Sequence, residues 1–136
     1  MNAGMIRVVA VDHIGIRVAD AQRSLAFYRR LGFAPVYYDE HDPVIVVRNE
    51  ANVEINFIVN ANPEHEPSNV LMDVPEKHAG YTHVALRVAS IEDTVRALGD
   101  LGIAITEGPK RLGDGMSLFV RDPDRNVIEL RQQLDA

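Results

Sequence analysis

Two histidines and two glutamates recur at matching places in the sequence and together could hold a metal ion. His13 and His83 each lie near the start of a β-branched apolar segment, and Glu54 and Glu129 each lie within a later one. A carboxylate among apolar neighbours is costly to bury unless it is paired or binds a metal. Two imidazoles and two carboxylates that converge with room for water would form an N₂O₂ site. Such a site suits divalent Ni, Zn, Co, Fe or Mn, whereas a structural zinc site is closed and tetrahedral.

Each of the four residues also has an ordinary structural explanation. A lone strand histidine is most often a hydrogen-bonded surface or core residue, and a lone strand glutamate usually lies on the solvated face. Their repetition favours the metal hypothesis, although duplication alone could preserve the pattern without function. We expect the remaining histidines, which lie in loop-like segments beside Pro, Glu or Lys, to be solvated: His41, His65 and His78.

The matching places belong to an internal repeat. When residues 83–104 are placed over residues 13–34, the identical pairs are His13/His83, Arg17/Arg87, Val18/Val88, Ala19/Ala89, Leu31/Leu101, Gly32/Gly102 and Ala34/Ala104. Farther on, Val46-Val47-Arg48 matches Phe119-Val120-Arg121. The segment Asn52-Val53-Glu54-Ile55 matches Asn126-Val127-Ile128-Glu129-Leu130 only with a gap of one residue. A repeat of this size indicates two copies of one supersecondary unit that pack together.

Both copies have the predicted order β-α-β-β-β. Helices are expected from Asp20 to Gly32 and from Ser90 to Gly102, because Asp and Ser favour N-caps and glycine favours helix ends. The predicted strands include 11–18, 35–39, 43–48 and 52–59 in the first copy, and 104–107, 116–121 and 126–132 in the second. We therefore expect a single domain, 1–136, with one module at 9–59, a linker or covering loop at 60–79, and a second module at 80–132. Residues 69–74 of that loop could form a short edge strand.

The composition excludes several classes of protein. The 136 residues carry a net charge of −6, are 46% hydrophobic and 25% charged, and include no cysteine. Disorder, disulfide scaffolds, thiolate nucleophiles and cysteine-ligated metals are thereby excluded. The acidic balance argues against nonspecific nucleic-acid binding, and no apolar run reaches the ~18 residues of a membrane span. With no signal-peptide pattern at the start, we expect a cytoplasmic protein with neither nucleic-acid nor membrane partners.

Four segments carry a family resemblance: Val11–Val18, Ser24–Phe33, Gly80–Val88 and Leu118–Leu130. They resemble the vicinal oxygen chelate superfamily. It includes glyoxalase I, extradiol dioxygenases, fosfomycin-modifying thiol transferases, methylmalonyl-CoA epimerase and bleomycin-resistance proteins. The resemblance extends from about Val9 to Arg131. It implies an α+β glyoxalase/dioxygenase fold, in which paired βαβββ modules form curved mixed sheets around a metal-containing cleft.

The resemblance also implies a ligand set and a reaction. His13, Glu54, His83 and Glu129 match the four-ligand pattern of glyoxalase I-like members. This pattern implies a metal-dependent lyase or isomerase similar to lactoylglutathione lyase. Its ion would chelate the vicinal oxygens of a small carbonyl compound or thiol adduct, such as a glutathione hemithioacetal, and stabilise an enediolate. A carboxylate ligand that detaches would be the catalytic base, Glu129 in first place and Glu54 in second.

Other readings stay open. Three ligands, His13, His83 and Glu129, would suffice for an extradiol dioxygenase or a fosfomycin-resistance-like thiol transferase, and a non-catalytic protein could sequester its ligand between the modules.

The sequence also departs from the glyoxalase I pattern. The stretch 32–54 is short for the glutathione pocket of glyoxalase I. Arg125 stands where glycine usually follows Asp-Pro-Asp, near the rim of a sheet. Further candidates for anion contacts are Arg17, Arg87 and Arg121, although a paired charge on the outer sheet face explains such arginines more often.

Small members with paired modules resemble homodimers whose site lies between module one of one chain and module two of the other. A site closed within one chain is the alternative. Several large apolar residues could line a pocket, although core packing explains most of them: Phe27, Tyr28, Phe33, Tyr37, Phe57, Met72, Met116 and Phe119.

Overall fold

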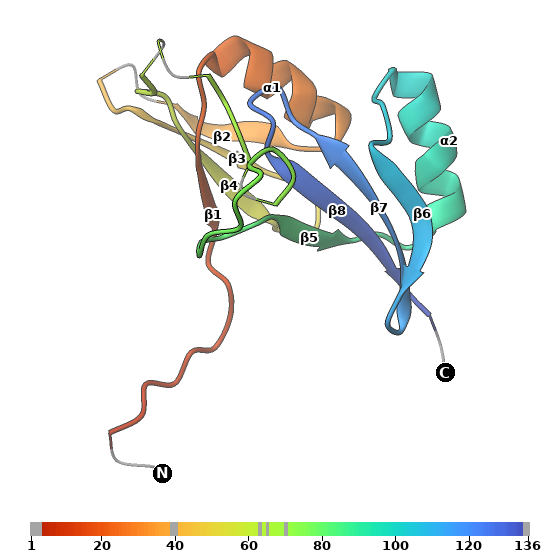
Figure 1. Ribbon diagram of the computed structural model, residues 1–136. Helices are drawn as coiled ribbons and strands as arrows, with labels where there is room; N and C mark the ends of the chain where they lie inside the picture. The colour runs from red at the N-terminus through yellow and green to blue at the C-terminus, as the bar shows by residue number, and fades with distance from the viewer. Residues whose placement is uncertain (1–3, 39–40, 63, 65, 70, 135–136) are drawn as a thin grey trace.

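Two four-stranded sheets, each accompanied by one helix, make up the computed structural model, which describes residues 4–38, 41–62, 64, 66–69 and 71–134 (Figure 1). The elements are β1 (Ile14–Arg17), α1 (Ala21–Arg30), β2 (Ala34–Tyr38), β3 (Val44–Arg48), β4 (Glu54–Ile58), β5 (Val84–Arg87), α2 (Ile91–Leu101), β6 (Glu107–Leu112), β7 (Gly115–Arg121) and β8 (Val127–Gln133). The predicted double βαβββ order is confirmed. His65 lies outside the described residues.

Both sheets have the same mixed topology. The strand orders are β1-β4-β3-β2 and β5-β8-β7-β6. In each sheet the first strand is parallel to the last, and the other pairs are antiparallel. The start of β1, which follows His13, therefore lies beside β4. In the same way the start of β5, which follows His83, lies beside β8.

The helix boundaries follow the predicted caps. The Asp20 carboxylate accepts a hydrogen bond from the Arg23 amide at 3.0 Å, and the Ser90 hydroxyl accepts one from the Asp93 amide at 3.1 Å. Gly102 ends α2 in the left-handed conformation, with φ of 72°. Such a φ favours glycine because it has no Cβ to clash with the following carbonyl.

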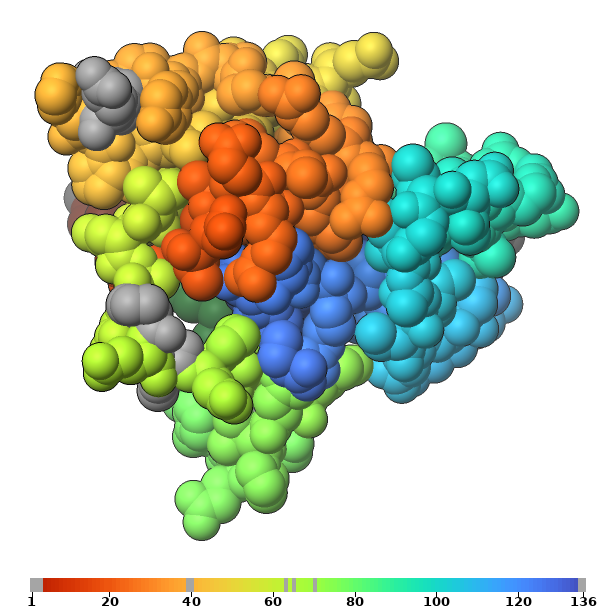
Figure 2. All heavy atoms as spheres, turned by 90° about the horizontal axis from the view of Figure 1, so that it is seen from above, coloured from red at the N-terminus to blue at the C-terminus, as the bar shows by residue number. Residues whose placement is uncertain are grey.

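The first module's helix packs against a turn of the second module. The buried hydroxyl of Tyr28 in α1 donates a 2.7 Å hydrogen bond to Asp122, in the turn between β7 and β8. Burial, together with the neighbouring Asp122 charge, raises the pKa of Tyr28 far above its ordinary value, so the hydroxyl stays a donor. Asp124 of the same turn accepts hydrogen bonds from the Ala19 amide and the Arg23 guanidinium, each at 3.1 Å. Figure 2 shows this blue turn against the orange first module.

Two predicted strands differ from the structure. The expected strand at 104–107 lies instead at Glu107–Leu112, an edge strand whose polar sequence lacks an alternating apolar pattern. The described residues within 69–74 form a turn rather than an edge strand. There the Asn69 amide donates to the Asp73 carboxylate and the Asp73 amide donates to the Asn69 carbonyl, both at 2.8 Å. Asn and Asp favour such turns because their side chains bond nearby backbone groups.

Asp73, in the loop between the modules, forms hydrogen bonds to arginines at the end of β7 and in the turn between β7 and β8. Its carboxylate, whose side chain is 11% exposed, accepts hydrogen bonds from both Arg121 and Arg125. The hydrogen bonds from Arg125 and then from Arg121 hold the pKa of Asp73 well below its usual range. Arg125 has a positive φ of 66°, so a paired arginine occupies a backbone conformation that favours glycine.

The chain before β1 is extended and exposed. It leaves the body of the molecule without regular structure (Figure 1), so the first strand begins at Ile14 rather than at residue 11. It exposes Met5, Ile6, Val8, Val9 and Val11. Within the described parts of the chain, neither helix is long and apolar enough to span a membrane.

Candidate metal centre

His83 and Glu129 meet on the second sheet. The Nε2 atom of His83 lies 2.9 Å from Oε1 of Glu129, and the two side chains are 27% and 11% exposed. The other carboxylate oxygen of Glu129 accepts a 2.6 Å hydrogen bond from the hydroxyl of Ser117, which is fully buried. The ring of Phe119 packs at the edge of the His83 imidazole, with centroids 5.9 Å apart. The predicted histidine and carboxylate of module two therefore lie in contact.

Opposing effects set the ionisation of Glu129. Burial raises its pKa, but hydrogen bonds from Ser117 and His83 and the positive charges of His83 and Arg131 outweigh burial. The pKa of Glu129 therefore lies below its ordinary value. The group is an anion at neutral pH and can serve as a ligand.

His13 and Glu54 lie close together beside the first sheet. The Nδ1 atom of His13 lies 2.6 Å from Oδ1 of Asp12, and the Glu54 carboxylate accepts a 2.6 Å hydrogen bond from Arg48. Nitrogen and oxygen atoms of Asp12, His13 and Glu54 all lie within 4.8 Å of one another. The predicted pair of module one is thus also close together, with Asp12 as an additional carboxylate.

Within one chain the four predicted ligands form two separate pairs, His13 with Glu54 and His83 with Glu129. Among the described residues, the only group of three or more potential ligands within 4.8 Å of one another is Asp12, His13 and Glu54. His83 and Glu129 therefore have no third such neighbour among the described residues of their own chain. The geometry of one chain does not bring the four predicted residues to one point.

Strand register shows that Asn56, and not Glu54, corresponds to Glu129. In the first sheet Asn56 is paired with Gly15 and Val46, and in the second sheet Glu129 is paired with Ala85 and Phe119. These neighbours are themselves repeat equivalents in the sequence. By the same register, Glu54 corresponds to Val127.

The turns before these strands support the same correspondence without a gap. Asn49 and Asp122 each accept hydrogen bonds, through a side-chain oxygen, from the backbone amides two and four residues later. Three residues after each of them, Asn52 and Arg125 have positive φ of 62° and 66°. The one-residue gap needed to align Glu54 with Glu129 is absent from the structure.

Asn56 has an unsatisfied polar atom. Its Oδ1 is buried and accepts no hydrogen bond from any described residue. A buried carbonyl oxygen without a partner costs about 1–3 kcal/mol, so such an atom in a native structure calls for a ligand, an ion or a water. A Cβ built at the neighbouring Gly15 would meet nothing within 4 Å, so open space adjoins Asn56.

The donor arrangement fits a divalent ion. Adjacent ligands about 2.1 Å from an octahedral ion lie about 3.0 Å apart. The 2.9 Å separation of His83 Nε2 and Glu129 Oε1 matches that distance. The imidazole of His13, which lies beside Asp12 and Glu54 and apart from this pair, is also a donor of the kind that borderline metals accept.

Residues beside the histidines orient their rings, a role that the sequence did not reveal. The ionised Asp12 can only accept, so Nδ1 of His13 carries the proton and Nε2 keeps its lone pair for a metal. The hydroxyl of Thr82 lies 2.8 Å from Nδ1 of His83 and can either donate or accept. A polar residue immediately before each histidine is the sequence signal that could have suggested this role.

Three of the four arginines considered for anion contacts, Arg17, Arg121 and Arg125, have partners elsewhere. Arg17 donates to the Asn60 side chain at 3.1 Å, and Arg121 and Arg125 both pair with Asp73. Arg131 lies 3.9 Å from the Glu129 carboxylate, farther than the imidazole of His83 at 2.9 Å. Arg87 lines a cavity of about 450 Å³ between the modules, next to Leu86 and Leu98.

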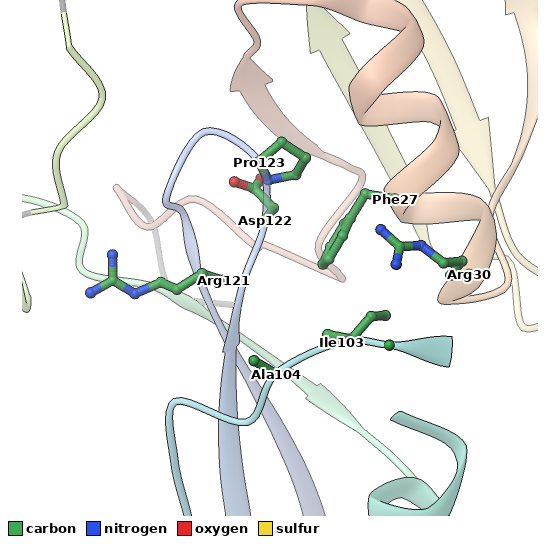
Figure 3. Close-up of a pocket in the computed structure, with 8 residues that line it drawn as sticks. Phe27, Arg30, Ile103, Ala104, Arg121, Asp122 and Pro123 are labelled. Atoms are coloured by element: carbon green, nitrogen blue, oxygen red, sulfur yellow. The ribbon is translucent and has the colours of Figure 1, made fainter. Parts of the chain in front are cut away.

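The cavity beside Arg87 is not lined by any of the four predicted ligands, and neither is a second cavity. The other, of about 260 Å³, lies between α1 and the end of β7, where Phe27 and Arg30 face Ile103 and Arg121 extends away (Figure 3). Of the large apolar residues considered for a pocket, five are buried in the core: Phe27, Tyr28, Phe33, Phe57 and Phe119. Tyr37 is 49% exposed, and Met72 and Met116 are half-buried.

Comparison with known proteins agrees with this architecture. A family model of the Glyoxalase/Bleomycin resistance protein/Dioxygenase superfamily matches residues 10–130. The chain is 30% identical to glyoxalase domain-containing protein RDO1 of Mycosarcoma maydis, over 96% of this chain and 72% of that protein. It is also 30% identical to lactoylglutathione lyase of Escherichia coli O157:H7, over 91% of this chain and 93% of that protein.

Solved structures share the fold. An integron cassette protein from the mobile metagenome of V. cholerae has a TM-score of 0.69 at 26% identity, covering 94% of this chain and 98% of that chain. The fosfomycin resistance protein FosX of Listeria monocytogenes has a TM-score of 0.68 at 18% identity, covering 93% and 94%, which is a likeness of fold alone. The match over nearly the whole chain, with the repeated βαβββ topology, shows that the chain belongs to the glyoxalase, bleomycin resistance protein and dioxygenase superfamily.

Proposed function

We propose that this protein is a metal-dependent enzyme, a lyase or isomerase that acts on a small substrate with two adjacent oxygens. The observation that carries this proposal is the contact of His83 Nε2 with Glu129 Oε1 at 2.9 Å, with Ser117 holding the second oxygen. A divalent ion between these donors would polarise the substrate oxygens and stabilise the negative charge that develops on them. The proposed ligands are His13, His83 and Glu129.

The protein groups around these ligands have distinct tasks. Asp12 and Thr82 hold the two imidazole rings, and Ser117 holds the Glu129 carboxylate. Glu129 is the proposed base, because it is anionic and lies on β8, the strand that pairs with β5 directly after His83. Glu54 stays a predicted fourth ligand and alternative base; its bond to Arg48 competes with both roles.

We further propose a homodimer in which each site combines His13 of one chain with His83 and Glu129 of its partner. This arrangement supplies the third ligand that the His83–Glu129 pair lacks among the described residues of its own chain. The exposed apolar residues of the N-terminal segment, Ile6, Val8 and Val9 among them, would gain a partner surface. A monomeric mass with metal bound would contradict the shared site.

Metal binding is the first test. Purified protein should titrate with Zn²⁺, Ni²⁺ or Co²⁺ in calorimetry, and the variants His83→Ala and Glu129→Gln should lose at least about tenfold in affinity. His78→Ala is the matched control, because His78 is an exposed loop histidine that lies 3.2 Å from a backbone carbonyl. Equal affinity in wild type, His83→Ala and His78→Ala would refute the site.

The finer proposal is lactoylglutathione lyase activity. Its support is the 30% identity to the Escherichia coli O157:H7 lyase over nearly the full length of both chains. The test is formation of lactoylglutathione from the hemithioacetal of methylglyoxal and glutathione, with Glu129→Gln as the inactive control. If metal-loaded protein leaves the hemithioacetal unchanged, the lyase assignment fails while the metal site stands.

A further inference from the structure

We propose that the cavity of about 450 Å³ between the two modules binds a small aromatic carboxylate, at a site separate from the metal centre. Small-molecule sites typically have volumes of ~300–1,000 Å³. The walls of the cavity include residues of α2 and of the turn between β3 and β4: Thr94, Ala97, Leu98, Asn49, Ala51 and Val53. A ligand held there would bridge the second module's helix and the first module's turn.

The cavity and the proposed metal ligands lie on opposite faces of the second sheet. Leu130 lines the cavity, whereas Glu129, its neighbour on β8, contacts His83. Successive side chains of a strand project to opposite faces of the sheet. The inference is therefore independent of the proposed function and goes beyond it.

The internal repeat shows what the chain itself places at the equivalent position in the other half. There α1 packs on the turn between β7 and β8, which are the counterparts of α2 and of the turn between β3 and β4. The Tyr28 hydroxyl donates to Asp122 at 2.7 Å. The Tyr28 ring centroid lies 5.2 Å from the ring centroids of both Phe27 and Phe57. Aromatic rings therefore fill this contact, and one of them carries a hydrogen bond to the turn.

Smaller residues replace these rings at the cavity. Each of the three aromatic residues has an aliphatic counterpart that lines the cavity: Ala97 for Phe27, Leu98 for Tyr28 and Leu130 for Phe57. Among the described residues, no hydrogen bond joins α2 to the turn between β3 and β4; the Thr94 hydroxyl donates within its own helix, to the Ser90 carbonyl. An aromatic ring is therefore the group that the cavity lacks relative to its filled counterpart.

The polar groups at the cavity favour a carboxylate on that ring. The side-chain oxygen of Asn49 accepts hydrogen bonds from the Ala51 and Val53 amides at 3.1 and 2.9 Å, so its NH₂ is the group left to bind a ligand. Arg30, which also lines the cavity, donates to the Leu101 carbonyl at 3.1 Å and forms no ion pair with a described residue. No described acidic residue lines the cavity. Both available groups are donors, and a carboxylate accepts from an amide and from a guanidinium.

The first experiment titrates chelator-treated, metal-free protein with phenylacetate by calorimetry. Phenylacetamide has the same shape without the charge, and hexanoate has the carboxylate without the ring. We expect phenylacetate to bind at least about tenfold more tightly than either probe. Equal binding of phenylacetamide or of hexanoate would overturn the proposed ligand class, and no binding at ~10 mM phenylacetate would overturn the site.

Variants locate the binding within the cavity. Ala97→Phe supplies the ring that Phe27 contributes in the other half, and it should weaken phenylacetate binding at least about tenfold by filling the space. Asn49→Asp keeps an acceptor for the turn amides, as Asp122 does, but removes the NH₂ and adds a negative charge, so we expect a similar loss. Ala97→Leu takes the place of Ala97→Phe if the larger ring prevents folding.

Matched controls separate this site from the surface and from the metal centre. Arg30→Met should weaken phenylacetate binding about fivefold or more, whereas Arg29→Met, at the exposed neighbouring position of α1, should change it less than about twofold. His83→Ala should bind phenylacetate as wild type does, and loss of binding there would place the ligand at the metal centre and overturn the proposal. Wild-type affinity in both Ala97→Phe and Asn49→Asp would also overturn it, and either result leaves the test of metal binding unaffected.

Discussion

The hydroxyl of Ser117 donates a 2.6 Å hydrogen bond to the carboxylate oxygen of Glu129 that faces away from His83. Both residues are buried, and they lie on adjacent strands, β7 and β8. This contact fixes which oxygen of Glu129 is presented to His83. A hydroxyl that orients a ligand carboxylate in this way contributes to affinity without touching the ion.

Ser117→Ala should therefore weaken metal binding by about 10–100-fold while the protein stays folded. The removed hydroxyl leaves one oxygen of Glu129 without its donor, and the carboxylate can rotate. Calorimetric titration with Zn²⁺ measures the effect. Ser24→Ala is the matched control, because Ser24 is equally buried but lies at 3.4 Å from Asp124, away from the ligands. Wild-type affinity in Ser117→Ala would show that Ser117 has no orienting role.

Protonation of Asp73 should destabilise the protein at acid pH. Hydrogen bonds from Arg125 and Arg121 hold the pKa of Asp73 below its value in the unfolded chain, which is about 3.9. The stabilisation is therefore fully present above pH ~4 and is lost as the pH falls through the folded-state value. Urea unfolding at pH 7, 5, 4 and 3 should show a gap between wild type and Asp73→Asn that narrows below pH 4. Asp100→Asn, at an exposed carboxylate of α2, should show no such trend.

Arg125→Gly should cost little, and Asp73→Ala should cost more. Glycine relieves about 1 kcal/mol of strain at a φ of 66°, which offsets the loss of an ion pair whose arginine is 51% exposed. Asp73→Ala leaves the 17%-exposed Arg121 without its carboxylate and should lose about 2–4 kcal/mol. Free energies of unfolding from denaturant titration decide the order. A greater loss in Arg125→Gly than in Asp73→Ala would contradict it.

Metal should raise the melting temperature in proportion to site occupancy. At a free concentration 100 times Kd, a ligand of the folded state contributes about 2.7 kcal/mol, or roughly 10 °C for a domain of this size. Excess chelator should reverse the shift in wild type and in His78→Ala. The same thermal shift in His83→Ala would mean that the ion binds elsewhere on the protein.

The sequence predicted the larger features because they depend on local signals. Asp20, Ser90 and Gly102 have side chains or backbone freedom suited to helix ends, and they are found there. The repeat predicted two modules of equal topology, which the sheets confirm. Strand β6 escaped prediction because Glu107–Leu112 has neither apolar alternation nor a β-branched residue.

The site was harder to predict because it depends on register. Because Glu54 and Glu129 are both glutamate, the sequence favoured an alignment with a gap that matches them. The pairing of the strands, which the sequence alone does not reveal, matches Asn56 with Glu129. The contacts of Asp73 with Arg121 and Arg125 join residues some fifty positions apart, so no local pattern could indicate them. Ser117 was missed because a buried serine in a strand has no distinctive spacing.

The contact of Tyr28 with Asp122 has a consequence for how the two halves of the gene can diverge. The counterpart of Tyr28 in α2 is the apolar Leu98. The counterpart of Asp122 is Asn49, whose side-chain oxygen, among the described residues, accepts hydrogen bonds from its own turn alone. The first module therefore depends on the second for the Tyr28–Asp122 hydrogen bond, and the equivalent pair, Leu98 and Asn49, forms no such bond. A substitution in the turn between β7 and β8 therefore alters a contact of α1 through Asp122, whereas Asn49 makes no equivalent bond to α2 among the described residues, so the two repeats tolerate different substitutions at matching positions.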